Sequence, residues 1–211
     1  SWLQRDTVRT RTTHLWQLDE GVVDLALGAD GRIFVLLADG RLVRLLATDL
    51  DAPVVQMAGR EAAVACLCTT AEWLVSGRPS GAIELRAGDG ASVLTTWQAH
   101  DAPLIAVAAE ASVLATIAED RHLRLWRLPS GERFADLPLD SLPRTVALRP
   151  DGLAVAVDTG DSRVLVHDLL TGAVTELRGH QRAVVAIAWC GKTHRLATGS
   201  DDGTMRLWDL D

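Results

Sequence analysis

The sequence predicts an all-β fold, a β-propeller of five recognisable four-stranded blades. Short apolar runs alternate along the chain with turn signals such as Asp-Gly, which is typical of successive hairpins. A pattern of spaced apolar residues recurs five times, at intervals of 42, 40, 39 and 41 residues. A period of about 40–45 residues is that of a propeller blade. The five repeats start at Leu18, Arg60, His100, Leu139 and His180.

The last repeat shows the pattern most clearly. It contains apolar runs at 184–189, 195–199 and 204–208, separated by Cys190-Gly191 and Asp202-Gly203. The first run has almost no polar alternation, which indicates a strand covered by protein on both faces. We therefore expect this sheet to pack between two similar sheets.

The other repeats keep this organisation to different degrees. The repeat at 100–138 is closest to the last one, at 180–211. The repeats at 18–59 and 60–99 have Leu45 and Arg86 where the last has Trp208, and the repeat at 139–179 has His167 there. Turn-forming residues are present in all of these repeats, so we expect each repeat to form the same kind of sheet.

Two short motifs carry a family resemblance. Gly179-His180 opens the last repeat and Leu207-Trp208-Asp209 closes it, and Ala99-His100 and Leu125-Trp126 repeat the arrangement. These residues resemble the signature of the WD-repeat (WD40) family, over roughly residues 12–210. The resemblance implies a ring in which an N-terminal strand completes the last blade.

The two chain ends have matching features. Residues 12–16 alternate like an outer strand, whereas the last repeat ends after its third strand. We predict a domain over 12–211, with 12–17 completing the last blade, after a linker or upstream tail at 1–11. Matched ends favour one closed ring of five blades. The alternative is a sector of a larger ring that further blades from other sequence complete.

Composition narrows the classes of partner. The 211 residues are 48% hydrophobic and 23% charged, which is typical of a globular domain. A net charge of −7 argues against a nucleic-acid surface and against an anionic membrane. We interpret the three cysteines as small buried hydrophobic residues, which is what we expect of a protein in the reducing cytoplasm. Scarce Lys, Asn and Tyr are typical of a GC-rich genome, and we expect a bacterial source.

Two groups of side chains combine histidine, hydroxyl, carboxylate and indole at the same spacing. In a catalytic interpretation threonine is the nucleophile and histidine its base. In the structural interpretation, which the family resemblance supports, they form a buried hydrogen-bond chain. Because two blades carry the set, we favour structure, and we expect no catalytic residue, no metal site and no cofactor. The groups are His100, Thr116, Asp120 and Trp126, and His180, Thr198, Asp202 and Trp208.

Function is expected at the rim formed by the turns before each first strand and between each second and third strand. The resemblance places partners there, and its small apolar residues suit contact with a protein or a neighbouring domain. We expect an interaction scaffold or regulatory module. The alternatives are a propeller enzyme with hydrolase or lyase chemistry in its channel, and a sensor domain fused to an effector. The rim candidates are Val23, Ile105, Arg144, Val185, Glu119 and Asp201.

Overall fold

The computed structural model describes residues 18–28, 31–47, 55–58, 64–191 and 193–211. Within these ranges nineteen strands form five antiparallel sheets, each within one of the predicted repeats. This confirms the predicted all-β fold. Blade one is β1 (Val22–Leu27), β2 (Arg32–Leu37), β3 (Leu42–Leu46) and β4 (Val55–Ala58); blade two is β5 (Cys66–Thr69), β6 (Trp73–Gly77), β7 (Ala82–Ala87) and β8 (Val93–Gln98).

The other three blades follow the same order. Blade three is β9 (Leu104–Glu110), β10 (Val113–Ala118), β11 (His122–Arg127) and β12 (Glu132–Pro138); blade four is β13 (Val146–Leu148), β14 (Ala154–Asp158), β15 (Val164–Asp168) and β16 (Val174–Leu177); blade five is β17 (Val184–Trp189), β18 (Arg195–Ser200) and β19 (Met205–Asp209). Each strand pairs with the next along the chain, as in a meander.

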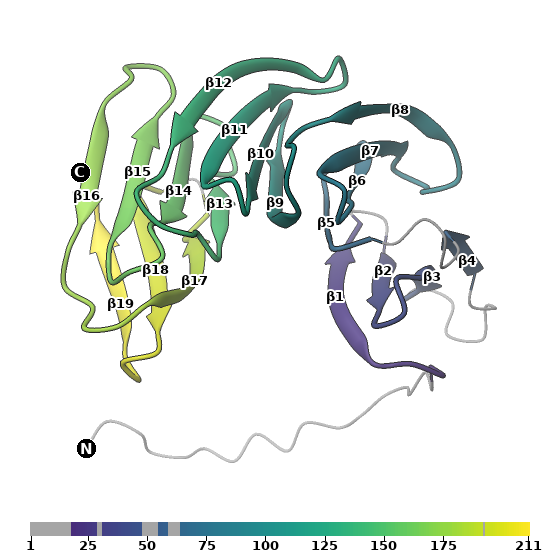
Figure 1. Cartoon of the computed structure of the whole chain (residues 1–211), viewed down its shortest axis with the longest axis horizontal. Helices are drawn as coiled ribbons and strands as arrows, with labels where there is room; N and C mark the ends of the chain where they lie inside the picture. Colours follow the sequence, from purple (N-terminus) through teal and green to yellow (C-terminus); the bar gives the residue numbers. More distant parts are fainter. Residues whose placement is uncertain (1–17, 29–30, 48–54, 59–63, 192) are drawn as a thin grey trace.

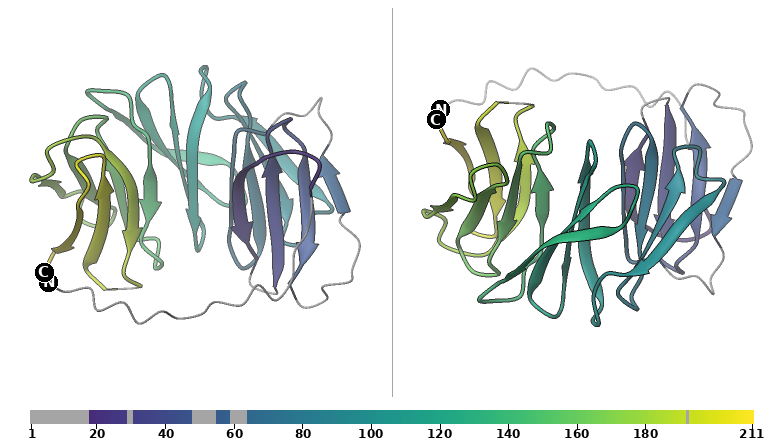
Figure 2. Two further views of the ribbon diagram at one scale, coloured as in Figure 1. Left: turned by 90° about the horizontal axis from the view of Figure 1, so that it is seen from below. Right: turned by 90° about the horizontal axis from the view of Figure 1, so that it is seen from above.

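The blades stand side by side in an arc, with blade one at one end and blade five at the other (Figures 1 and 2). The first strand of each blade contacts the first strand of the next: β1 meets β5, β5 meets β9, β9 meets β13 and β13 meets β17. The first strands therefore follow the inner side of the arc, and the fourth strands its outer side (Figure 1).

Tight turns between strands depend on glycine. Gly81 joins β6 to β7 with φ near +86°, a conformation that costs other residues energy. A Cβ there would also overlap the carbonyl oxygen of His100, which begins the next blade. The Ser80-Gly81 turn signal is thus needed for the conformation of the turn and for its contact with the following chain.

The hydrophobic core lies between successive blades. Ile83 and Leu85 of blade two are fully buried against a cluster that includes Leu104, Leu114 and Trp126 of blade three. A second cluster joins blades three and four, and a third joins blades four and five. Each blade alone would expose both apolar faces to water, so stacking supplies most of the burial.

The described strands test the expected closure of the ring only in part. The predicted strand at 12–16 and its pairing with 204–208 lie outside the described residues, and blade five has three described strands. Blades one and five lie at opposite ends of the arc in every view (Figures 1 and 2). The pairing that would close the ring therefore stays a prediction, and the described blades by themselves form an open arc. The angle between blades is set by side-chain packing, and five blades fill only part of a circle.

One cysteine differs from the expectation of burial. Cys66 lies in the core, and burial raises the pKa of its thiol to about 12. Cys190 is exposed, because it occupies the turn between β17 and β18. The apolar run that precedes it ends at Trp189, one residue earlier.

Candidate functional site

In blade three the four predicted side chains form one hydrogen-bond chain. Trp126 Nε1 donates to Thr116 Oγ1 at 2.9 Å, and the threonine oxygen lies 2.8 Å from His100 Nε2. His100 Nδ1 lies 2.9 Å from Asp120 Oδ2. A neutral imidazole with its proton on Nδ1 satisfies every contact, because Nε2 then accepts the hydroxyl proton. The chain links the third strand to the turn before the first.

Blade five repeats this chain. Trp208 Nε1 donates to Thr198 Oγ1 at 2.8 Å, and Thr198 Oγ1 lies 2.8 Å from His180 Nε2. His180 Nδ1 lies 2.9 Å from Asp202 Oδ2. The Asp202 carboxylate also accepts hydrogen bonds from Thr204 Oγ1 and the Gln181 amide, and these bonds hold its pKa well below the usual range.

Burial of these groups suits a structural role. His100, Thr116, His180 and Thr198 are each almost completely buried. Burial lowers the pKa of His100, which keeps the ring neutral although the Asp120 carboxylate opposes this shift. A hydroxyl that already donates to an imidazole and accepts from an indole has no accessible position for a substrate. The two hydrogen-bond chains therefore hold strands to turns.

In blades two and four, other polar groups take the place of the hydrogen-bond chain. In blade two Arg86 takes the tryptophan position, where its Nε donates to Glu84 Oε1 at 2.6 Å. Arg78 also pairs with Glu84. In blade four Asp158 is fully buried and accepts the backbone amides of Arg144 and Thr145, both at 2.7 Å. Its carboxylate thereby fixes the start of the first strand.

Sequence reasoning missed this role of Asp158. Burial raises the pKa of its carboxyl group, and the two amide bonds oppose that shift. The available signal was the Asp158-Thr-Gly turn, because aspartate before a turn often accepts backbone amides. His167, in the tryptophan position of the same blade, has a buried Nε2 for which the described residues provide no partner.

The predicted rim residues lie on one edge of the arc, but their exposure differs. Val23 and Val185 have exposed fractions of 60% and 44%. Leu142, on the same rim in blade four, is also exposed. Ile105, the third apolar rim candidate, is only partly exposed, because it packs against the cluster between blades three and four.

Two of the charged residues predicted for the rim form an ion pair between blades four and five. Arg144 Nη1 lies 3.3 Å from Asp201 Oδ2, and both side chains are more than half exposed. Glu119, in the matching turn of blade three, is exposed. An exposed ion pair adds little to stability, so this pair is available to a charged partner.

A hollow of about 340 Å³ opens between blades one and two on this rim. Its lining is mostly apolar, and the acidic Asp39 beside it bonds to Arg41 Nε at 2.7 Å. A pocket of this kind suits an uncharged side chain. Its lining includes Val23, Leu37, Ala38, Val64, Ala65 and Pro79.

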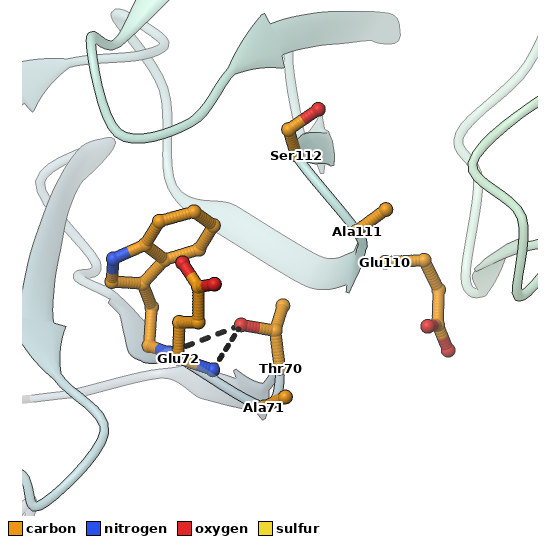
Figure 3. Close-up of a pocket in the computed structure, with 7 residues that line it drawn as sticks. Thr70, Ala71, Glu72, Glu110, Ala111 and Ser112 are labelled. Atoms are coloured by element: carbon orange, nitrogen blue, oxygen red, sulfur yellow. Dashed lines mark hydrogen bonds between the residues drawn. The ribbon is translucent and has the colours of Figure 1, made fainter.

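A larger hollow, of about 470 Å³, lies at the opposite edge, between the first turns of blades two and three. Thr70 Oγ1 accepts the amides of Glu72 and Trp73 there, at 3.2 and 3.0 Å (Figure 3). The Glu110 side chain points away from Thr70 (Figure 3). Burial raises the pKa of Glu110. Since the polar groups do not converge, this hollow provides no evident chemistry.

The inner side of the arc offers little polar chemistry. Asp24, on β1, accepts the Leu67 amide of blade two at 3.2 Å and the amide of Leu25 at 2.8 Å. Its carboxylate thus links blades. Across the described residues, no three His, Cys, Asp or Glu side chains gather to hold a metal ion. That same part of the chain contains no helix long and apolar enough to cross a bilayer.

Two family models match the chain. One, described as WD domain, G-beta repeat, matches residues 172–209, which include the second hydrogen-bond chain. The other, described as IP5P C-F beta-propeller, matches residues 6–126, more than half of the sequence. The chain belongs to the WD40-repeat β-propeller family.

Several WD40-repeat proteins resemble parts of the chain. It is 30% identical over 105 residues to F-box/WD repeat-containing protein sel-10 of Caenorhabditis elegans, covering 48% of this chain and 18% of that protein. It is 35% identical over 101 residues to WD repeat-containing protein 90 of Xenopus tropicalis, covering 47% of this chain and 5% of that protein. The Serine-threonine kinase receptor-associated protein of Bos taurus is 26% identical over 141 residues, with coverages of 65% and 40%. The chain therefore spans less than half of each relative.

Solved structures share the fold. A chain in the Crystal Structure of Mitotic Checkpoint Complex superposes with a TM-score of 0.80 at 22% identity, over 98% of this chain and 70% of that one. The computationally designed Ika8 protein gives a TM-score of 0.73 at 21% identity, over 90% and 58%. Both comparisons concern the arrangement of blades alone.

Proposed function

We propose that this WD40 chain is a protein-interaction module that binds a protein partner or neighbouring domain through its rim. The observation that carries the proposal is the group of exposed apolar side chains on rim turns held by buried hydrogen bonds. Val23, Leu142 and Val185 are exposed, and the turns beside them are fixed by Asp158 and by the His180 chain. Apolar surface on a rigid support favours binding, because little conformational entropy is lost.

The rim also suggests which partner fits. Its hollow between blades one and two accepts an uncharged side chain, and the Arg144–Asp201 pair beside Val185 adds a polar contact. The name of one relative, Serine-threonine kinase receptor-associated protein, describes association with another protein, which supports the proposal. We propose no chemistry for the chain itself, since both threonine hydroxyls are buried.

The test is site-specific photo-crosslinking in the cells that make the protein. A photoreactive residue replaces Val23 or Val185 on the rim, or Val93 or Leu170 as exposed controls away from the rim. The rim positions should capture one common partner that the controls do not. With that partner purified, Val23→Asp should weaken binding at least about tenfold, the equivalent of 1.4 kcal/mol. Its unfolding midpoint should not change.

Charge reversal provides the second measurement. Glu119→Arg and Asp201→Arg should change the association rate and its salt dependence more than the dissociation rate, because both carboxylates are exposed. Partners captured only at Val93 and Leu170 would show that the outer strands, and not the rim, form the binding surface.

A further inference from the structure

A hollow of about 340 Å³, which we call the outer hollow, lies between blades three and four at the edge opposite the rim. It is bounded by β11 and β12 of blade three, and by β15, β16 and the turn between them in blade four. Phe134 and Val174 of its mostly apolar lining have exposed fractions of 38% and 53%. Apolar surface here is therefore in contact with water. The lining includes Phe134, Leu137, His167, Asp168, Gly172 and Val174.

The interface between blades two and three shows what fills the same space one blade earlier. Trp97 of β8 packs against Trp126 of β11, with 6.0 Å between the ring centroids. Gly131, in the turn from β11 to β12, lies under the first of these rings, because a Cβ there would be 3.1 Å from Trp97. An indole thus covers the turn glycine at this interface.

Strand register makes the two interfaces equivalent. Leu137 and Trp97 occupy the same position on the fourth strands of blades three and two. Gly172 and Gly131 each lie five residues after the tryptophan position of their blade, and the amide of each donates to the carbonyl four residues earlier at 2.9 Å. His167 occupies the tryptophan position of blade four. The outer hollow therefore has a leucine and a histidine where the preceding interface has two indoles.

The smaller side chains leave the space over the turn glycine open. A Cβ on Gly172 would have no heavy atom within 4 Å, whereas Gly131 is covered by the Trp97 ring. Protein interiors are close-packed, so the lining of an open apolar space lacks contacts that a matching group would supply. An aromatic ring of the size of an indole matches the side chain that is missing here.

The histidine of the outer hollow lacks the partner that its position has in other blades. The indoles of blades three and five donate to a threonine ten residues earlier, but Val157 takes that place in blade four. His167 Nε2 is buried, and no described residue provides it with a partner. Burial lowers the pKa of His167, so the ring is neutral and one of its nitrogens is an acceptor. Because the χ2 torsion of histidine has broad wells, the ring can turn a nitrogen toward a donor in the hollow.

The other ionisable group of the lining, Asp168, is also an acceptor. Hydrogen bonds from the amide and the hydroxyl of Thr171 hold the pKa of its carboxyl below the usual range, so it is ionised near neutral pH. A carboxylate beside a neutral imidazole favours a ligand that donates hydrogen bonds and disfavours an anion. The outer hollow therefore suits an aromatic ring with a donor.

We propose that the outer hollow binds an indole-type ring, which lies against Leu137 and Gly172 and donates its N–H to the imidazole of His167. The ring takes the place that Trp97 fills one interface earlier, and the volume of the hollow is within the range of small-ligand sites. A free aromatic molecule and a tryptophan side chain of another polypeptide present this same chemistry. The hollow and the rim lie at opposite edges, so this inference does not depend on the rim proposal.

The experiment titrates the whole chain with indole, with 1-methylindole and with N-acetyltryptophanamide by isothermal titration calorimetry. Indole should bind saturably and about fivefold more tightly than 1-methylindole, which has no N–H, because one hydrogen bond contributes a factor of this order. In His167→Phe the two compounds should bind equally, since the ring keeps its shape and loses its acceptor.

Leu137→Trp tests the space itself. The new indole has the position of Trp97 and should fill the outer hollow, so indole binding should weaken at least about tenfold without a fall in the unfolding midpoint. Leu94→Trp, the same substitution at an exposed position of β8, is the matched control and should bind indole as the unchanged chain does. The comparison of His167→Phe with the unchanged chain still decides if Leu137→Trp does not fold.

The third compound distinguishes the sources of the ring. N-acetyltryptophanamide binding as tightly as indole would assign the outer hollow to a tryptophan of another polypeptide, and binding of indole without the amide would assign it to a free aromatic molecule. Both results support the proposal. Absence of saturable binding for both compounds, or equal indole affinity in Leu137→Trp and the unchanged chain, would overturn it. A preference for indole over 1-methylindole that persists in His167→Phe would overturn the role of the imidazole.

Discussion

At the scale of single residues, the hydrogen-bond chains of blades three and five combine polarity with complete burial. A buried imidazole between a hydroxyl and a carboxylate is stable only when every donor and acceptor has a partner. His100 and His180 meet this condition through Thr116 and Asp120, and through Thr198 and Asp202. Losing one member leaves its neighbours unsatisfied in a dry environment.

His180→Ala should lower the free energy of unfolding by about 1–3 kcal/mol, because Asp202 and Thr198 lose a buried partner. His100→Ala should have a similar effect for the same reason. Urea denaturation followed by tryptophan fluorescence measures both changes. His194→Ala, at an exposed histidine, is the control. Unchanged stability in both buried variants would contradict a structural role.

Stability should also fall as the pH drops from about 7.5 to 5.5. Burial lowers the pKa of His100 and of His167 in the folded chain. As the pH falls, these imidazoles therefore take up protons at a higher pH in the unfolded chain than in the folded one. Both groups have folded pKa values below the ordinary value of about 6.5, so protonation below that pH favours unfolding. His100→Gln should flatten the pH dependence measured by denaturant titration. An equally steep dependence in His100→Gln would show that His100 does not contribute.

At the scale of the element, the blades share one meander but attach their turns differently. Blades three and five use the histidine chain, blade four uses Asp158, and blade two uses the buried Arg86–Glu84 pair. The sheet tolerates these replacements because its strands are held by backbone hydrogen bonds and by packing against neighbours. The contacts between blades are more sensitive to side-chain volume.

Gly77→Ala tests this sensitivity. The added Cβ would lie 2.7 Å from Cys66 Sγ and 2.9 Å from Leu104 Cδ1, so we expect destabilisation of about 1–3 kcal/mol. Gly199→Ala is the matched substitution, because it has the same register position in blade five with free space, and it should change stability by less than about 0.5 kcal/mol. Thermal unfolding of both variants provides the comparison. Equal losses would mean that the space around Gly199 is already filled.

At the scale of the whole molecule, the arc has two apolar ends. Leu25 and Leu27 of blade one and Met205 and Leu207 of blade five are all exposed. A net charge of −7 favours solubility but does not hide these faces. Apolar patches at the ends of a stack of sheets promote association with whatever apolar surface is available.

We therefore expect the isolated chain to bind the hydrophobic dye ANS. Met205→Glu combined with Leu207→Glu should reduce the dye fluorescence without lowering the unfolding midpoint, because both side chains are exposed. Leu170→Glu, which changes an exposed leucine outside both ends, should reduce it much less. Fluorescence titration at matched protein concentration gives the result, and equal effects of the two variants would locate the dye elsewhere.

The sequence by itself determined the repeat period, the turns and the members of both histidine chains. Each depends on local pattern and spacing, and a hairpin places residues at fixed separations, as Thr116 and Trp126 show. Only the tertiary structure decided which apolar residues are covered. Met205 resembles Leu123 in the sequence pattern, yet the one is exposed and the other buried. The difference depends on whether a neighbouring blade about forty residues away in the chain is present, and no local pattern contains that information. Ile105 and Asp158 escaped prediction for the same reason, because their surroundings come from packing between distant segments.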